Sequence, residues 1–348
     1  MKYKTFIKII ALGLCFCLAL AGAFVYYVDP YFQYHEPQNG LAYDMEMNLF
    51  SYYNAGIAKN FSYDTIVTGS SMSRAMEPSY IDEVLKCSTV KLSMAEARGA
   101  DYKILFSLVE KNPDLKKVIM GMDTFAFYVD KDYSSYEKPM HLYDENILND
   151  VLYVLNIDGL TESCKVLLNT IRGGKTTSMD DYQNYVLTNS FSKEQVVEIY
   201  KDNLPSVQQT KTDISVMKKR TIANLEQNLI PTIEDNPNIE FVFYFPPYSI
   251  AKWGLTADID MEIECMKLLT ERLIKYDNVS IYFYQGQTDV VTDLEHYMDT
   301  IHFDDYVAKK IVDYIGDATN KMTMDGYENE IEEFRIFIEN YDYKKIIE

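Results

Sequence analysis

The sequence is poor in the residue types that bind metals. It has four histidines and five cysteines in 348 residues, and two of the cysteines, Cys15 and Cys17, fall in an apolar N-terminal segment. The other three are far apart, so they form neither a disulfide framework nor the closely spaced ligand pairs of a zinc site. We therefore expect no metal ion and no other cofactor.

Basic residues are also scarce. Lys and Arg number 33 against 53 Asp and Glu, which gives a formal net charge of -20. The first 28 residues contain three lysines and no acidic residue, so the rest of the chain stands at -23. An electrostatic field of that sign repels nucleic acid at long range. The charge therefore argues against nucleic acid as a partner.

The N-terminal region contains a long uncharged run over residues 9–28. Twenty helical residues extend about 30 Å, which matches the hydrocarbon core of a bilayer. Because lysines precede the run, the positive-inside rule places the N-terminus in the cytoplasm and the rest of the chain outside. The sequence thus predicts a transmembrane anchor over residues 1–28 and a juxtamembrane connector over residues 29–60. A signal peptide cleaved near Ala21-Gly22-Ala23 is the alternative, although the run is longer than a usual signal core.

From Asp64 onward, short apolar runs alternate with helical patterns. Continuous apolar runs are typical of strands covered on both faces, and their alternation with helices is typical of a parallel sheet. The sequence therefore predicts an α/β domain over residues 61–348 with a five-stranded parallel sheet. The predicted strands cover residues 65–68, 90–93, 117–120, 240–245 and 279–284, and the predicted helices cover residues 100–111, 193–203, 214–230, 259–276 and 305–319.

The alternation is interrupted at about residues 124–190. This part contains a helical pattern at residues 146–153 and a Gly173-Gly174-Lys175-Thr176 loop. The loop is no phosphate-binding motif, because position 169 is Asn where that motif requires glycine, and no strand precedes it. We interpret the region as an insertion near the carboxyl edge of the sheet, where it can form a lid or a substrate wall.

Two distant segments carry the residue types of nucleophilic catalysis. Gly69-Ser70-Ser71 directly follows the first predicted strand, at the edge where open α/β sheets bind ligands. Asp299 lies three residues before His302, just ahead of the helix predicted at residues 305–319. A serine hydroxyl becomes a strong nucleophile when an imidazole held by a carboxylate accepts its proton. We therefore expect Ser71, His302 and Asp299 to meet at one edge of the sheet.

These segments resemble the motif blocks of the SGNH (GDSL-like) hydrolases over roughly residues 64–316. In that family a nucleophilic serine follows the first strand in a Gly-Asp-Ser block, and an Asp-x-x-His block precedes the last helix. Here Ser70 takes the place of the aspartate, and Ser71 is the corresponding nucleophile. The resemblance implies a flavodoxin-like three-layer sandwich with Ser71, His302 and Asp299 as catalytic residues.

The resemblance also points to two residues that would bind the oxyanion. The family's second block supplies a glycine whose backbone N–H donates a hydrogen bond, and Gly99 lies at the corresponding place. The third block normally supplies an Asn side chain, where this sequence has Asp123. A carboxylate cannot donate unless it is protonated, and its charge opposes a developing oxyanion. Either Asp123 points elsewhere, or another donor replaces it, or activity is low.

The resemblance implies a serine esterase or O-acyltransferase. A Gly-Ser-Ser block also occurs in membrane-anchored relatives such as the D-alanine transfer protein of teichoic acid esterification. Together with an outer-face location, this favours acyl esters of cell-envelope glycans as substrates, with a glycan or acyl donor, the membrane and a membrane-bound acyltransferase as partners. Ser70 and Asp123 leave open a catalytically silent module that binds glycans or scaffolds an envelope complex. A nonenzymatic α/β protein with accidental motifs is the third alternative.

Overall fold

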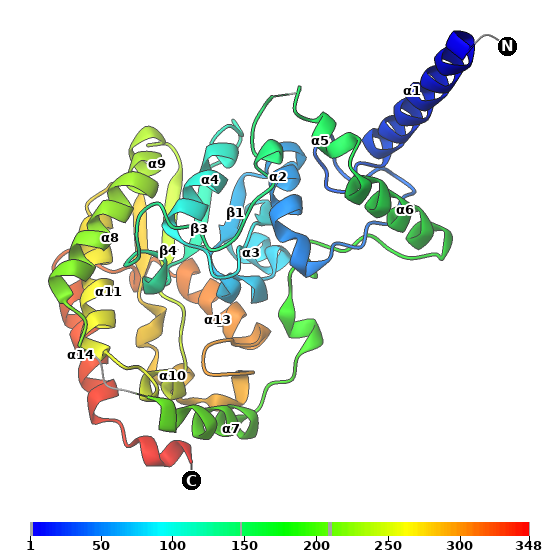
Figure 1. Ribbon diagram of the computed structural model, residues 1–348. Coiled ribbons are helices and arrows are strands. Elements are labelled where there is room, and N and C mark those ends of the chain that lie inside the picture. Colours follow the sequence, from blue (N-terminus) through cyan, green and yellow to red (C-terminus); the bar gives the residue numbers. More distant parts are fainter. Residues whose placement is uncertain (1–2, 147, 208–210, 348) are drawn as a thin grey trace. The chain divides into compact units, whose positions relative to one another are not determined.

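The computed structural model describes residues 3–146, 148–207 and 211–347, and the chain forms two compact units (Figure 1). The first unit consists of Met1–Phe61 with Lys138–Ser178, and the second consists of Ser62–Glu137 with Met179–Glu348. The connector predicted at residues 29–60 and the middle of the predicted insertion thus belong to the first unit. Both ends of the insertion belong to the second.

The second unit contains a five-stranded sheet in the order β2-β1-β3-β4-β5, with every pair parallel. This is the order of flavodoxin-like sheets, in which ligands bind beyond the carboxyl ends of the strands where the order reverses. The central residues of the strands are buried, as the continuous apolar runs predicted. The strands are β1 (Thr65–Thr68), β2 (Thr89–Lys91), β3 (Lys117–Gly121), β4 (Glu240–Tyr244) and β5 (Val279–Tyr282).

Helices cover both faces of this sheet. One group packs as α4 on α8, α8 on α11 and α11 on α14, and a second group pairs α3 with α13 (Figure 1). The predicted α/β fold with a parallel sheet is therefore confirmed. The helices of this unit are α3 (Pro78–Leu85), α4 (Gly99–Val109), α7 (Lys193–Asn203), α8 (Ile214–Asn228), α9 (Ile230–Asp235), α10 (Ile250–Gly254), α11 (Ile259–Leu273), α12 (Thr288–Thr292), α13 (Asp305–Gly316) and α14 (Tyr327–Asn340).

The first unit contains α1 (Tyr3–Val28), α2 (Phe50–Asn60), α5 (Val151–Val154) and α6 (Ile157–Ile171). Helix α5 is shorter than the helix predicted at residues 146–153, part of which, Ile147, lies outside the described residues. The segment after α1 is ordered around the buried Asp29 carboxylate, which accepts hydrogen bonds from the Gln33 and Tyr34 backbone N–H groups and from the Tyr153 hydroxyl. These bonds join two stretches that are more than 100 residues apart in the sequence.

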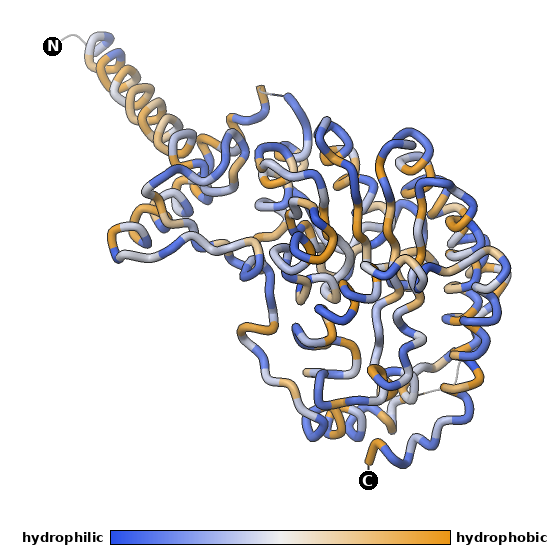
Figure 2. Tube along the Cα trace, turned by 180° about the vertical axis from the view of Figure 1, so that it is seen from behind, coloured by the Kyte–Doolittle hydropathy of each residue, from blue (hydrophilic) through white to orange (hydrophobic). Residues whose placement is uncertain are grey.

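Among the described residues, α1 is the one helix long and apolar enough to cross a membrane. Its side chains are mostly exposed, and Figure 2 shows hydrophobic colour along most of its length. A helix of the core of a soluble protein would be buried instead. The C-terminal end of α1 differs from the rest, because Val25 and Val28 are buried within the first unit.

Candidate active site

The backbone turns sharply after β1 and presents two serines. Gly69 has φ 142°, a conformation that side-chain-bearing residues rarely adopt. A Cβ at this position would also lie 3.1 Å from Ser73 Oγ and 3.2 Å from the backbone nitrogen of Gly121. The chain then enters a short 3₁₀ helix at Ser71, where the Ser70 hydroxyl accepts a hydrogen bond from the Met72 N–H. Ser70 is buried, whereas Ser71 is partly exposed.

We expect Gly69→Ala to destabilise the second unit. The substitution forces an unfavourable φ and crowds β3, and strain of this kind costs about 1–3 kcal/mol. The free energy of unfolding, measured by urea denaturation followed through the single tryptophan, Trp253, tests this expectation. Because Trp253 is buried in the same unit, its fluorescence reports on the relevant core. A variant as stable as the wild type would show that this turn tolerates a side chain.

The Ser71, His302 and Asp299 side chains form one hydrogen-bonded chain. Ser71 Oγ lies 2.7 Å from His302 Nε2, and His302 Nδ1 lies 2.7 Å from Asp299 Oδ2. The other Asp299 oxygen accepts the backbone N–H groups of Ile301 and His302 at 2.8 and 2.7 Å. Residues 231 positions apart in the sequence thus meet in the geometry that activates a serine hydroxyl.

The loop that carries His302 is held on several sides. Backbone bridging joins Tyr297 with Phe303, the Gln195 side chain of α7 donates to the Met298 carbonyl, and the Ser249 hydroxyl donates to the Thr300 carbonyl. The Tyr185 ring meets the imidazole of His302 edge-on at 5.3 Å. The imidazole is therefore fixed before any substrate binds.

The charge of Asp299 suits its position. Burial alone would raise the pKa of this carboxyl, but the His302 imidazole and the backbone N–H groups of Ile301 and His302 hold the pKa below its ordinary value of 3.8. Asp299 is consequently ionised at neutral pH and accepts the Nδ1 proton of His302. This tautomer leaves Nε2 free to accept the proton of Ser71.

Asp123 follows β3 at the same edge of the sheet and is 1% exposed. Its Oδ1 accepts a hydrogen bond from the Tyr248 hydroxyl, while Oδ2 is buried without a well-formed hydrogen bond to any described residue. Gln285 fixes Tyr248 by exchanging hydrogen bonds with its backbone N–H and carbonyl. Burial raises the pKa of Asp123, and the nearby hydroxyls of Ser70 and Tyr248 and the imidazole of His302 act in the opposite direction.

Gly99 has a packing role that the sequence did not reveal. It begins α4, and a Cβ there would overlap the Asn224 Oδ1 of α8 at 1.8 Å. The tight turn in the loop after β2 lies a little earlier, where Glu96 has φ 54° and Ala97 N donates to the Met94 carbonyl. Met94 N in turn donates to the Gly69 carbonyl at 2.9 Å, which places this turn beside the serine loop. Gly99 as an oxyanion donor stays a prediction.

The other histidines occupy different surroundings. His296 also has an aspartate three residues before it, Asp293, but its Nδ1 pairs with Asp304 at 2.7 Å and its ring stacks on Tyr306. His35 and His141 belong to the first unit. The spacing Asp-x-x-His therefore occurs twice in the sequence, and the contact with Ser71 distinguishes His302.

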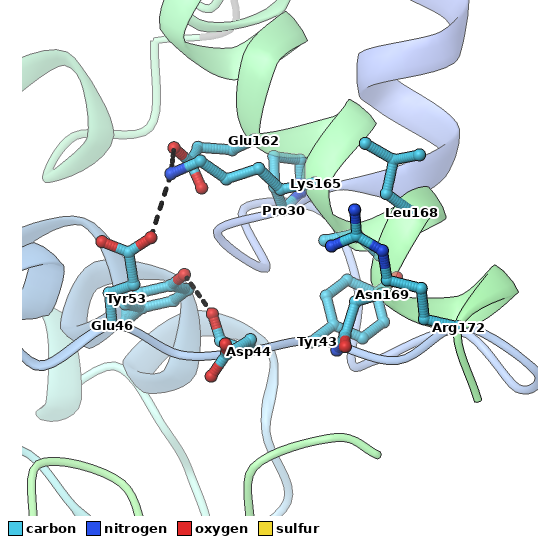
Figure 3. Close-up of a pocket in the computed structure, with 11 residues that line it drawn as sticks. Pro30, Tyr43, Asp44, Glu46, Tyr53, Glu162, Lys165, Leu168, Asn169 and Arg172 are labelled. Atoms are coloured by element: carbon cyan, nitrogen blue, oxygen red, sulfur yellow. Dashed lines mark hydrogen bonds and ion pairs between the residues drawn. The ribbon is translucent and has the colours of Figure 1, made fainter. Parts of the chain in front are cut away.

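A separate pocket of about 210 Å³ lies within the first unit (Figure 3). Its wall combines charged side chains with apolar ones, and Lys165 pairs there with Glu46 at 2.9 Å and with Glu162 at 2.8 Å. All of its lining residues belong to the first unit, so it is distinct from the Ser71 site. It is lined by Pro30, Tyr43, Asp44, Glu46, Tyr53, Glu162, Lys165, Val166, Leu168, Asn169 and Arg172.

Comparisons with known proteins leave the family assignment as a proposal. No protein-family model matches the chain, and a search of curated proteins finds no significantly similar sequence.

Proposed function

We propose that this protein is a membrane-anchored serine esterase or O-acyltransferase of the SGNH type that acts on acyl esters of cell-envelope glycans outside the cytoplasmic membrane. The single observation that carries the proposal is the hydrogen-bonded chain from Ser71 through His302 to Asp299. The sheet order and the position of the serine after β1 agree with that family.

The proposed reaction begins when Ser71 Oγ attacks the ester carbonyl carbon and its proton passes to His302 Nε2. Asp299 stabilises the imidazolium that forms. Backbone N–H groups, with those of Ser71 and Gly99 as candidates, bind the oxyanion. Collapse of the tetrahedral intermediate expels the alcohol, which takes the proton from His302, and an acyl-enzyme remains. Water then completes hydrolysis, or a sugar hydroxyl completes transfer, with His302 again acting as the base.

The envelope assignment rests on α1. Its length, apolarity and exposed side chains suit a membrane span, and the lysines of the N-terminus favour a cytoplasmic N-terminus. Val25 and Val28, near the end of α1, are buried in the first unit. Cleavage after Ala23 would remove most of the helix that holds these two side chains in place, so their burial supports a retained anchor over a cleaved signal. A glycan, an acyl donor and a membrane-bound acyltransferase are the proposed partners.

A fluorophosphonate probe tests the proposed function. We expect it to label full-length protein at one residue, Ser71, as identified by peptide mass spectrometry, because only an activated serine attacks the probe at a useful rate. Ser71→Ala should abolish labelling, whereas Ser70→Ala should retain it, because Ser70 is buried and makes no bond to His302 among the described contacts.

The alternative is a catalytically silent module of the same fold that binds glycans or scaffolds an envelope complex. The buried carboxyl of Asp123 favours it, because this side chain stands where the family has an Asn donor and, once ionised, opposes an oxyanion. A folded wild-type protein that fails to react with the probe would contradict the enzyme proposal and support the silent module.

A further inference from the structure

Helix α6 (Ile157–Ile171) has three distinct faces. Successive residues turn by about 100° around a helix, which gathers the small or buried residues Gly159, Ser163 and Val166 on one side. A polar face follows, with Asp158, Glu162, Lys165 and Asn169. The third face, here called the apolar stripe, spans about 100° of the helix circumference. The apolar stripe consists of Ile157, Leu160, Cys164, Leu167, Leu168 and Ile171.

The apolar stripe is exposed within the first unit. Ile157 and Ile171 are 71% and 72% exposed, and Leu168 is 50% exposed. Large apolar residues of the preceding segment, Leu152 at 55% and Leu155 at 44%, extend the same kind of surface. Monomeric soluble proteins rarely expose so many contiguous large apolar side chains, and patches of this size mark contact with a protein or a membrane.

The polar face of α6 already has protein partners. Lys165 pairs with Glu46, and Figure 3 shows Glu162, Lys165 and Asn169 around the pocket while Leu168 points away from Asp44 and Tyr53. Leu168 also lines the pocket and Leu160 is half-buried, but the rest of the apolar stripe is exposed within the unit.

Contacts with α1 fix the positions of α5 and α6 along the α1 axis. Both pack against α1, and a Cβ added at Gly22 would lie 3.1 Å from Leu155 Cδ2. A Cβ added at Gly159 would similarly lie 3.4 Å from Val25 Cγ1. Gly22 lies six residues before the end of α1, which corresponds to about 9 Å along the helix axis. Figure 1 shows α6 leaving this end of α1 crosswise instead of continuing along it.

We infer that the apolar stripe, with the exposed leucines beside α5, lies in the lipid–water interface on the outer side of the membrane that α1 crosses. This inference rests on the membrane anchoring included in the proposed function. Amphipathic helices of this kind bury their apolar face about 5–10 Å into the boundary between headgroups and acyl chains. With Val28, the end of α1, taken as the outer boundary, the Gly22 contact places Leu155 about 9 Å and the Val25 contact places Gly159 about 4.5 Å below it. The stripe continues the apolar surface of α1, so lipid is the occupant that both helices share.

Charge contributes little to this attachment. Residues 138–178 contain four Lys and Arg against five Asp and Glu, so the region has no excess of basic residues to attract anionic lipid. Insertion should therefore be as complete in phosphatidylcholine vesicles as in vesicles that also contain phosphatidylglycerol. With α1 and α6 both in the membrane, the first unit is attached along two directions and cannot rotate freely about the α1 axis.

Spin labelling of native Cys164 in the full-length protein, reconstituted in vesicles, tests the inference. Cys15, Cys17 and Cys87 are replaced, and Cys265 stays because it is fully buried. A nitroxide in lipid collides often with oxygen and rarely with a water-soluble nickel chelate. The matched control is a label on the polar face, introduced by Asp158→Cys with Cys164→Ser. We expect the label at residue 164 to have a higher oxygen collision rate than the control and a nickel collision rate several-fold lower than the control.

Each other outcome overturns the inference. A nickel collision rate equal to that of the Asp158→Cys control would place the apolar stripe in water. Low rates for both oxygen and nickel would mean that a protein, such as a second copy of this chain, covers the stripe. A label on Cys17 alone, in the middle of α1, separates failure of the anchor from failure of the stripe. If Cys17 lies in lipid and Cys164 does not, the anchor stands and only the α6 inference is wrong.

Discussion

Replacing His302 by alanine is expected to lower kcat/KM for an activated acyl ester by about four to six orders of magnitude. The imidazole is the group within hydrogen-bond distance of Ser71 Oγ, at 2.7 Å, so no other described side chain is in place to accept the serine proton. Ser71→Ala should cause a loss of the same size because it removes the nucleophile. The double variant should be no worse than either single one, because the two residues act as a unit. Steady-state kinetics on the full-length protein measures all three.

His296→Ala is the matched control for this experiment. His296 belongs to the same loop region, pairs with an aspartate and is partly buried, but it bonds to Asp304 and not to a serine. Its loss should leave kcat within a few-fold of the wild type. Equal losses in the His302 and His296 variants would indicate a general disturbance of the loop, and an unchanged rate in Ser71→Ala would contradict the assignment of the nucleophile.

The sheet was predictable because its strands are buried on both faces and read as uninterrupted apolar runs. Both β1 and α7 have the predicted bounds, and the other predicted elements of this unit end within three residues of the observed ones. Helix α14 was not predicted, although Tyr327, Ile331, Phe334 and Ile338 form a buried face at helical spacing. This spacing is itself the sequence signal of a helix.

The first unit was less accessible to sequence reasoning. Helix α6 has apolar residues at helical spacing, but they lie on its exposed side, and its buried side consists of small residues such as Gly159 and Ser163. The segment after α1 is ordered by long-range bonds, such as the one from the Tyr153 hydroxyl to Asp29 Oδ1 at 2.7 Å. Bonds between residues so far apart depend on the tertiary structure, so local patterns predicted only a connector and an insertion.

The candidate site was also predictable only in part. The position of Ser71 after the first strand and of His302 before the helix Asp305–Gly316 placed both at one edge of a parallel sheet. Spacing could not choose between His302 and His296, because each follows an aspartate by three residues. It also gave no sign of Tyr248, whose hydroxyl donates to Asp123 and whose backbone bonds to the Gln285 side chain. Contacts from separate elements decided both points.

Asp123→Asn is expected to increase the rate of acyl transfer at pH values above the folded-state pKa of Asp123, which burial raises. One oxyanion-hole donor contributes about 3 kcal/mol, or a factor of about 10²–10³ in kcat. The amide is isosteric with the carboxyl, so its oxygen can still accept from Tyr248. Its nitrogen then takes the place of Oδ2, the buried atom without a well-formed bond, beside the Ser70 hydroxyl. The substitution thus replaces a charge that opposes the oxyanion with a neutral donor.

The pH dependence of this gain identifies its cause. Because burial raises the folded-state pKa of Asp123, the carboxyl is protonated and able to donate below that pKa and is ionised above it. The ratio of the variant's kcat/KM to that of the wild type should therefore grow as pH rises through the pKa and approach one at lower pH. The free energy of unfolding of the wild type should also fall, relative to that of the variant, as pH rises through the folded-state pKa of Asp123. The reason is that the folded state binds this proton more tightly than the unfolded chain does.

Glu262→Gln is the control for the pH experiment. Glu262 is another buried carboxyl nearby, and it accepts a hydrogen bond from Thr124 and makes no contact with Ser70 or Tyr248 among the described bonds. Neutralising it leaves the carboxyl of Asp123 in place and provides no new donor there, so kcat above the pKa of Asp123 should change little. Because the charge of Glu262 helps to raise the pKa of Asp123, this variant should shift the pH dependence of the rate to lower pH without removing it. If Asp123→Asn lowers the rate at every pH, the carboxylate assists the reaction, and position 123 must then support His302 or Ser71 instead of binding the oxyanion.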